Sequence, residues 1–159
     1  MSCLPRNHPE EKEEEKKTPT LDELFQEALH HTRRPTLMRQ FICSFNVESF
    51  AGQPFEEIFY EIWQQRPAGI SKLGVYDIAS KIFKYNGGNI PVIYLVGNGP
   101  IEAVKNLSLT SKIKKQKIND ITLDYIEIDE VLPFVTERYT GSTTDGDDIE
   151  SFLCVMHRL

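Results

Sequence analysis

Apolar residues recur at intervals of three and four along several stretches of the chain, the spacing of one face of an α-helix. This pattern predicts helices over 21–32, 55–65, 75–86 and 149–157. The first starts with a capping-box pattern, because Thr20 precedes Glu23 by three positions. Asp147 or Asp148 is expected to cap the last. Each stripe indicates a helix packed on a core.

Two other stretches are rich in β-branched residues and predict strands, at 90–96 and 121–128. Short helices are expected over 101–107 and 129–139. Residues 36–50 are densely apolar, and their spacing fits either a helix or a buried pair of strands. The fold class is therefore α+β and mainly α, with about six helices and a small two-stranded sheet.

The first twenty residues differ in composition from the rest of the chain. They are rich in Glu, Lys and Pro and poor in apolar residues, a composition typical of disorder. The remaining 21–159 have the length of one domain, and 40% hydrophobic residues in the chain suffice for a core. We expect a disordered charged tail at 1–20 and a single globular domain at 21–159.

The sequence also favours a cytoplasmic protein. It contains no apolar run of membrane-spanning length, and its N-terminus lacks the apolar segment of a secretion signal. The three cysteines, Cys3, Cys43 and Cys154, are far apart, which is typical of reduced thiols. We expect no contact with a membrane.

Charge is distributed unevenly along the chain, whose net charge is −6. Residues 21–119 carry twelve basic and nine acidic side chains, whereas 120–159 carry two basic and ten acidic ones. This asymmetry fits a basic binding face beside an acidic segment, and it equally fits surfaces that simply differ in charge.

The two helices around a short glycine-containing connection resemble the helix-hairpin-helix motif over residues 55–86. Gly69, Ile70, Gly74 and Ala79 can be placed on its glycine, apolar and small positions. Tyr76 departs from the motif, since it stands where a second glycine is expected. The resemblance implies backbone N–H groups presented to a nucleic-acid phosphate.

A second resemblance rests on three segments, LGVYDIASKI, VIYLVGNGPIEAVKNL and IESFLCV. They are similar to a set of uncharacterised bacterial proteins. Those proteins share a Tyr-Asp at a helix start, a tyrosine-containing strand before a glycine turn, and an acid-Phe-Leu-Cys ending. This likeness implies a common fold and brings no activity with it.

A cluster of lysines follows at 112–117, and lysines attract phosphate in a salt-dependent way. A solvated loop or helix face explains the same cluster. Our first hypothesis is a small non-enzymatic module that contacts a nucleic-acid backbone. Its candidate residues are Gly69, Ser71, Lys72, Gly74, Lys81, Lys84, Lys112, Lys114, Lys115 and Lys117.

Two further hypotheses come from other functional classes. The chain could be a protein-interaction domain that uses its acidic C-terminal quarter or its tail. It could also be a nucleotide-dependent enzyme built on the Gly97–Pro100 turn, since glycine turns before helices seat phosphates. Cys154 and His157 have the spacing of half a zinc site, but no second pair matches. We assign no catalytic residue, metal or cofactor.

Overall fold

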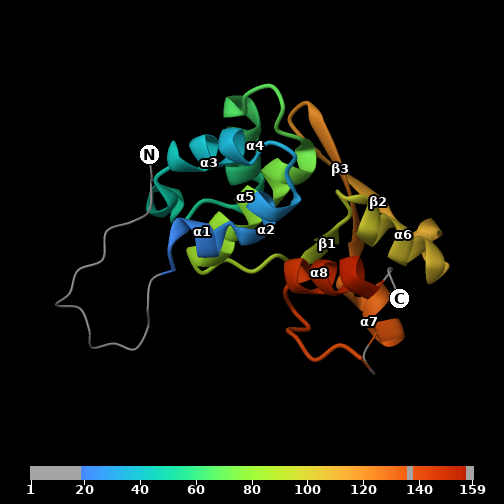
Figure 1. The fold of residues 1–159 in the computed structure, drawn as a ribbon. Helices are drawn as coiled ribbons and strands as arrows, with labels where there is room; N and C mark the ends of the chain where they lie inside the picture. Colours follow the sequence, from blue (N-terminus) through green and yellow to red (C-terminus); the bar gives the residue numbers. More distant parts are fainter. Residues whose placement is uncertain (1–18, 136–137, 157–159) are drawn as a thin grey trace, which may run out of the picture.

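The computed structural model describes residues 19–135 and 138–156. This part is a mainly helical α+β structure with eight α-helices, of which six have at least seven residues, and one three-stranded antiparallel sheet (Figure 1). The predicted fold class is therefore confirmed. The predicted two-stranded sheet is wrong, because a third strand forms where a solvated loop or helix was expected.

The helices are, in chain order, α1 (Leu21–Leu24), α2 (Gln26–His31), α3 (Pro35–Cys43), α4 (Phe55–Gln65), α5 (Lys72–Tyr85), α6 (Asn98–Asn106), α7 (Ile128–Val135) and α8 (Gly146–Met156). The strands are β1 (Val92–Tyr94), β2 (Lys114–Ile118) and β3 (Ile121–Glu127). Two short 3-10 helices are η1 (Val47–Phe50) and η2 (Thr110–Lys112).

The additional strand, β2, pairs with β3 along the edge of the sheet, whose order is β1-β3-β2. Asn119, with φ +56°, and Asp120 connect Ile118 to its partner Ile121 in a tight turn. Asn and Asp suit such turns because their side chains tolerate a positive φ. Opposite charges across the strands, such as Lys115 and Asp124, add to the pairing.

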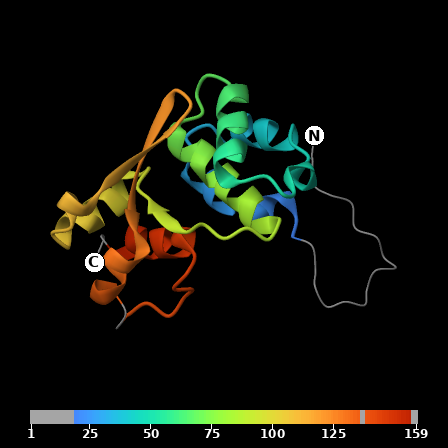
Figure 2. The same ribbon diagram turned by 180° about the vertical axis from the view of Figure 1, so that it is seen from behind.

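The sheet lies between two hydrophobic clusters, one on each face. Tyr94 and Leu123 face the cluster formed by α1–α5, while Ile93 and Ile126 face the cluster formed with α6–α8. Successive residues of a strand point to opposite faces, so each strand contributes to both clusters. Figures 1 and 2 show α1–α5 on one side of the molecule and α6–α8 beside the sheet on the other.

Several helix boundaries differ from the pattern in the sequence. The helix expected over 21–32 is divided at Phe25 into α1 and α2. The ambiguous stretch 36–50 is helical, as α3 followed by η1. Helix α5 starts three residues earlier than expected, because the Ser71 side chain accepts a hydrogen bond from the Gly74 N–H and caps it.

The start of α8 is pressed against β1. The N–H of Gly146 donates to the Ile90 carbonyl at 2.6 Å, and a Cβ on Gly146 would lie 1.8 Å from the Val92 oxygen. The predicted cap by Asp147 or Asp148 is wrong. Asp145 fills that role, accepting from the Asp148 N–H at 3.2 Å.

The remaining expectations concern the N-terminal tail, the cysteine and histidine side chains, and contact with a membrane. The predicted tail at 1–20 falls almost wholly outside the described residues, as does His157. The expectation of reduced thiols is wrong for Cys43, which takes part in a disulfide bond. Among the helices that the structure describes, none is long and apolar enough to cross a membrane.

Candidate anion-binding site

The connection between α4 and α5 is short and ordered by its own hydrogen bonds. Gly69 has φ +104°, a value that glycine adopts without strain. The Ile70 N–H donates to the Pro67 carbonyl, and Ser71 then caps α5. Helices α4 and α5 are thus joined by a short, ordered turn.

A cavity of about 310 Å³ lies directly against this hairpin. Its floor consists of residues that are buried in the core, namely Ala28, Met38, Gly74 and Asp77. Exposed or half-buried residues form its rim, namely His31, Thr32, Arg33, Arg34, Gly69, Ser71 and Leu73. The cavity therefore opens to solvent at the α2–α3 connection and closes on α5.

Two arginines give the rim its charge. Arg33 and Arg34 are exposed, and within the described residues neither forms an ion pair. The side chain of Arg34 lies over the hairpin turn, since a Cβ on Gly69 would come within 3.0 Å of its Cδ. A guanidinium group presents several N–H donors in a plane that matches carboxylate and phosphate oxygens.

The first turn of α5 reaches the same cavity, whose lining includes Ser71 and Leu73. The N–H groups of Lys72 and Leu73 occupy the first two helical positions, where no intrahelical acceptor exists, and of these two residues Leu73 lines the cavity. The aligned peptide dipoles of this fourteen-residue helix favour negative charge there. The Gly74 N–H is not among these donors, because Ser71 caps it and the residue is buried beneath Met38.

Asp77 is the one acidic side chain of the cavity wall. It is only 8% exposed, and the described part of the chain provides its carboxyl group with neither a hydrogen bond nor an ion pair. Burial, followed by the charges of Glu27 and Asp147, raises its pKa to about 8 against the opposing effect of Lys81. At neutral pH the group is mostly protonated, so it does not repel an anion.

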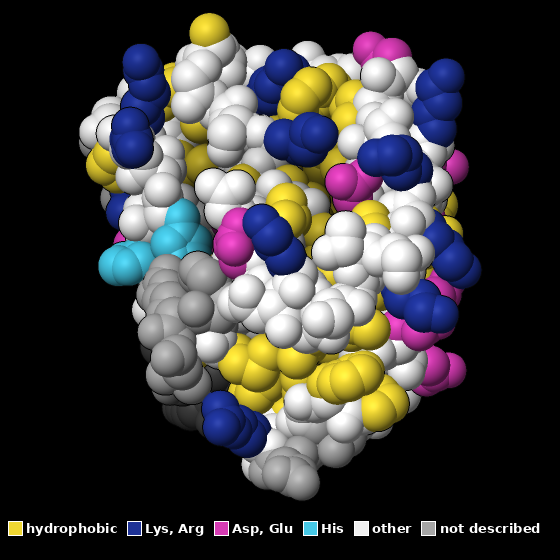
Figure 3. Space-filling view, turned by 90° about the vertical axis from the view of Figure 1, so that its right-hand side faces the viewer, with side chains coloured by type: hydrophobic (Ala, Val, Ile, Leu, Met, Phe, Trp, Pro, Cys, Tyr) yellow, Lys and Arg dark blue, Asp and Glu magenta, His cyan; other side chains and the backbone are white. Residues whose placement is uncertain are grey.

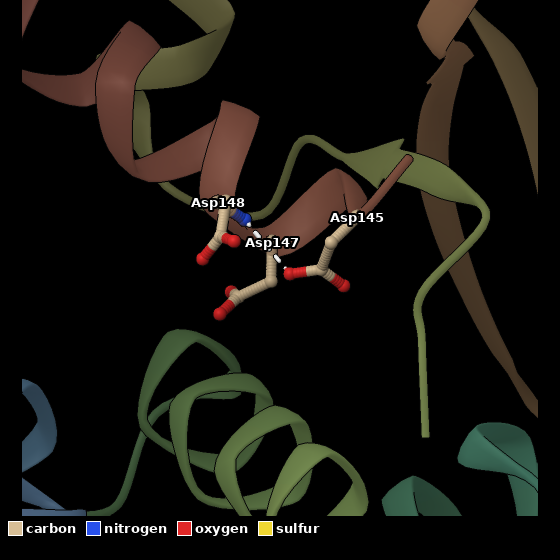
Figure 4. A group of neighbouring side chains, drawn as sticks. All are labelled: Asp145, Asp147 and Asp148. Atoms are coloured by element: carbon tan, nitrogen blue, oxygen red, sulfur yellow. Dashed lines mark hydrogen bonds between the residues drawn. The ribbon is translucent and has the colours of Figure 1, made fainter. Parts of the chain in front are cut away.

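Lys81 and Lys84, both candidate residues, project from α5 toward α8 and are engaged within the molecule. The ammonium group of Lys84 lies 2.7 Å from Asp145, 3.1 Å from Asp147 and 2.9 Å from Asp148. Lys81 lies 3.1 Å from the same buried Asp147. Figure 4 shows the three aspartates at the start of α8, with the carboxylates of Asp147 and Asp148 extending toward α5.

These contacts change the proton affinity of the buried groups. Burial alone would raise the pKa of Asp147, but Lys81 and Lys84 outweigh it and hold the pKa below its usual value. Tyr76 donates to the other oxygen of Asp147 at 3.0 Å. For Glu150, burial together with Asp147, Asp77 and Glu27 outweighs the opposing charge of Lys81 and raises its pKa to about 9.

The three aspartates have the spacing of a cation site, since one carboxylate oxygen from each lies within 4.8 Å of the others. Carboxylate oxygens are the ligands that hard divalent cations prefer. Here Lys84 and Lys81 already supply positive charge to these oxygens. The arrangement is an internal salt-bridge network between α5 and α8.

Three of the other candidate lysines, Lys112 of η2 and Lys114 and Lys115 of β2, have acidic partners. Their ammonium groups are within 4.0, 3.4 and 2.9 Å of carboxylates of Glu130, Glu127 and Asp124, respectively. Lys117, also in β2, lies beside a groove lined with glutamates of α4, and Lys72 of α5 reaches the Thr122 carbonyl at 3.4 Å.

The right-hand face of the molecule carries no continuous basic patch. Its Lys and Arg side chains stand apart and are interspersed with Asp and Glu (Figure 3). Hydrophobic side chains gather on its lower part. The exposed large hydrophobic residues of the described chain are Phe134 of α7 and Val155 of α8.

The Gly97–Pro100 turn, which supported the enzyme hypothesis, is packed against other elements. Helix α6 begins at Asn98, so Gly99 and Pro100 belong to its first turn. A Cβ on Gly97 would meet Leu73 at 3.3 Å, and a Cβ on Gly99 would meet the Cys154 sulfur at 2.7 Å. The need for close packing explains both glycines.

The structure thus brings Gly69, Ser71 and Gly74 to one cavity, with Lys72 beside them, and places the other candidate lysines elsewhere. Sequence reasoning missed Arg33 and Arg34, which follow the helix predicted over 21–32 and were not among the candidate residues. Two consecutive arginines before a proline, at the start of α3, were the available signal. The burial of Asp77 left no local signal in the sequence.

The comparisons with known proteins add nothing to this geometry, since no protein-family model, no curated protein and no solved structure matches the chain.

Proposed function

We propose that this protein is a small non-enzymatic binding module that contacts the sugar-phosphate backbone of nucleic acid at the cavity beside the α4–α5 hairpin. The observation that carries the proposal is that Arg33 and Arg34, which form no ion pair with any described residue, lie at the same cavity as the first turn of α5. Cationic side chains and free helical N–H groups are the donors that proteins direct at phosphates.

The proposal revises the sequence hypothesis in its choice of residues. Gly69, Ser71 and Lys72 remain in it, while Lys81 and Lys84 do not, because buried aspartates already hold their ammonium groups. The hairpin between α4 and α5 supports the likeness to the helix-hairpin-helix motif. We also propose kinship with the uncharacterised bacterial proteins, on the basis of the three sequence segments that carry the resemblance.

Replacement of Arg33 and Arg34 by alanine tests this function. Binding of fluorescently labelled single- and double-stranded DNA and RNA is measured at several salt concentrations. The double variant should bind about tenfold or more weakly at low salt, and its slope of log affinity against log salt should be shallower by about one to two units, since each lost phosphate contact removes roughly one.

Arg138→Ala is the matched control, because Arg138 is exposed and lies outside the cavity. It should leave both affinity and slope close to those of the wild type. Lys81→Glu is a poor test, since it would place a carboxylate beside buried Asp147 and disturb the fold. Undetectable binding of DNA and RNA by the wild type even at low salt would disprove the proposed function.

A further inference from the structure

The cavity extends further into the protein than contact with a nucleic-acid backbone at the surface requires. Its rim carries Arg33, Arg34 and the first turn of α5, whereas Asp77 lies on its floor and is 8% exposed. A strand that runs across the surface reaches the rim donors and leaves Asp77 without a partner. Burial of an unsatisfied polar group is costly, so its position calls for an explanation.

The spacing of these groups along α5 defines what could enter. Asp77 follows Leu73 by four residues, which places it about 6 Å further along the helix axis and on the same face. A phosphate held at the first turn by N–H groups and arginines therefore lies about one helical turn from the carboxyl group of Asp77. A protonated carboxyl can both donate and accept a hydrogen bond.

We propose that the cavity receives a terminal phosphomonoester together with its attached nucleoside, the phosphate lying at Arg33, Arg34 and the first turn of α5 and a sugar hydroxyl or base amino group lying at Asp77. This inference rests on the proposed function for the identity of the polymer, because a strand end and a free nucleotide share this chemistry. The volume of about 310 Å³ lies at the small end of the range for ligand sites, as a single nucleotide requires.

The site differs from an ordinary helix N-terminus in two respects. The rim cations are not compensated within the described residues, and a buried carboxyl without a partner lines the floor. By contrast, the other cluster of ionisable groups, around Asp147, is internally satisfied by Lys81, Lys84 and Tyr76. Among the described residues, the cavity beside the hairpin combines exposed arginines without ion pairs with a buried carboxyl group on its wall.

Binding of three ligands by the wild-type chain tests the inference. They are one short single-stranded DNA with a 5′-phosphate, the same strand with a 5′-hydroxyl group, and adenosine 5′-monophosphate. The phosphorylated strand should bind at least about tenfold more tightly, because a dianionic phosphate on charged donors adds strong hydrogen bonds that the hydroxyl end lacks. The monophosphate should compete with it.

Variants of Asp77 then distinguish the contribution of the cavity floor to ligand affinity from that of the rim. Asp77→Ala should weaken the binding of adenosine 5′-monophosphate and of the phosphorylated strand by about tenfold, because the nucleoside loses the hydrogen bonds of the carboxyl group. Asp77→Asn retains a donor and an acceptor of similar size, so it should keep both affinities within about threefold. Circular dichroism establishes that each variant is folded before its affinity is compared.

The outcomes distinguish this inference from the proposed function. Equal affinity of the wild type for both strands overturns the inference and leaves backbone binding intact. Binding of the monophosphate alone, with no strand bound, supports the cavity as a nucleotide site and disproves the nucleic-acid function. Absence of binding by all three ligands at low salt overturns both. An affinity for the monophosphate that Asp77→Ala does not reduce overturns the assignment of Asp77.

Discussion

Two carboxyl groups, those of Asp77 and Glu150, lie in the part of the core where α5 meets α8. Each is 8% exposed, and burial is the main reason why their pKa values rise to about 8 and about 9. An unfolded chain would release both protons near pH 4. The folded protein therefore retains protons that the unfolded chain has lost over most of the neutral range.

The stability of the protein should consequently fall as pH rises from about 4 to about 8. In this window the native state binds more protons than the unfolded state, so the free energy of unfolding decreases with pH, by at most about 1.4 kcal/mol per pH unit for each such group. Asp77→Asn removes one titration and should gain stability relative to the wild type progressively across the window.

Urea denaturation monitored by the fluorescence of Trp63, the single tryptophan, measures this difference at a series of pH values. Glu150→Gln should behave in the same direction, with its window extending to about pH 9. A difference between variant and wild type that stays constant from acidic to alkaline pH would show that these carboxyl groups ionise normally in the folded protein.

Individual residues also show which parts of the candidate site could be predicted from the sequence. The hairpin residues Gly69 and Ser71 were identifiable because glycine and a capping serine leave a local signal. Arg33 and Arg34 were not, since their role depends on α2 and α3 bringing them over a turn more than thirty positions later. Asp77 follows the start of the predicted helix 75–86 by two positions, and its burial depends on residues distant in the sequence, such as Ala28 of α2 and Met38 of α3.

At the scale of elements, the contact of α8 with β1 depends on one residue without a side chain. A Cβ on Gly146 would lie 1.8 Å from the Val92 carbonyl oxygen, and the backbone on both sides would have to move. Gly146→Ala should therefore lower the free energy of unfolding by more than about 3 kcal/mol, the range typical of severe steric clashes.

Gly87→Ala is the control for that substitution. A Cβ on Gly87 would meet no atom within 4 Å, and its cost arises only from the positive φ of +91°. This variant should lose about 1 kcal/mol. Thermal and urea denaturation give both values, and a loss at Gly146 no larger than that at Gly87 would mean that α8 is not pressed against β1 as described.

The elements themselves were predictable to different degrees. The 3.6-residue period identified α4, α5 and α8, because each buries a single apolar face. Strand β2 was missed, since Lys114, Lys115 and Lys117 give it no apolar alternation. Its pairing depends on the Asn119 turn and on acidic partners in β3, and these come together only when the hairpin forms.

At the scale of the whole molecule, one sheet serves two hydrophobic clusters. Because β1 and β3 contribute side chains to both clusters, disruption of one cluster also disturbs the strands against which the other cluster packs. We therefore expect the described part to unfold in a single cooperative transition. This expectation agrees with one domain over 21–159, which the sequence predicted.

Leu153→Ala tests this coupling. Leu153 is completely buried in the cluster formed with α6–α8, whereas Trp63 reports from α4 in the other cluster. The substitution should cost about 2–4 kcal/mol and shift the Trp63 fluorescence midpoint and the circular dichroism midpoint equally. A dichroism midpoint that moves while the fluorescence midpoint stays would indicate that the two halves unfold independently.

The salt bridges from Lys81 and Lys84 to Asp147 join positions more than sixty residues apart in the chain. During synthesis on a ribosome, α5 emerges long before the aspartates that neutralise its lysines. Until that later segment follows, the two ammonium groups lack the carboxylate of Asp147 that both contact in the folded protein. The final packing of α5 is thus completed only after the segment that carries Asp147 has left the ribosome.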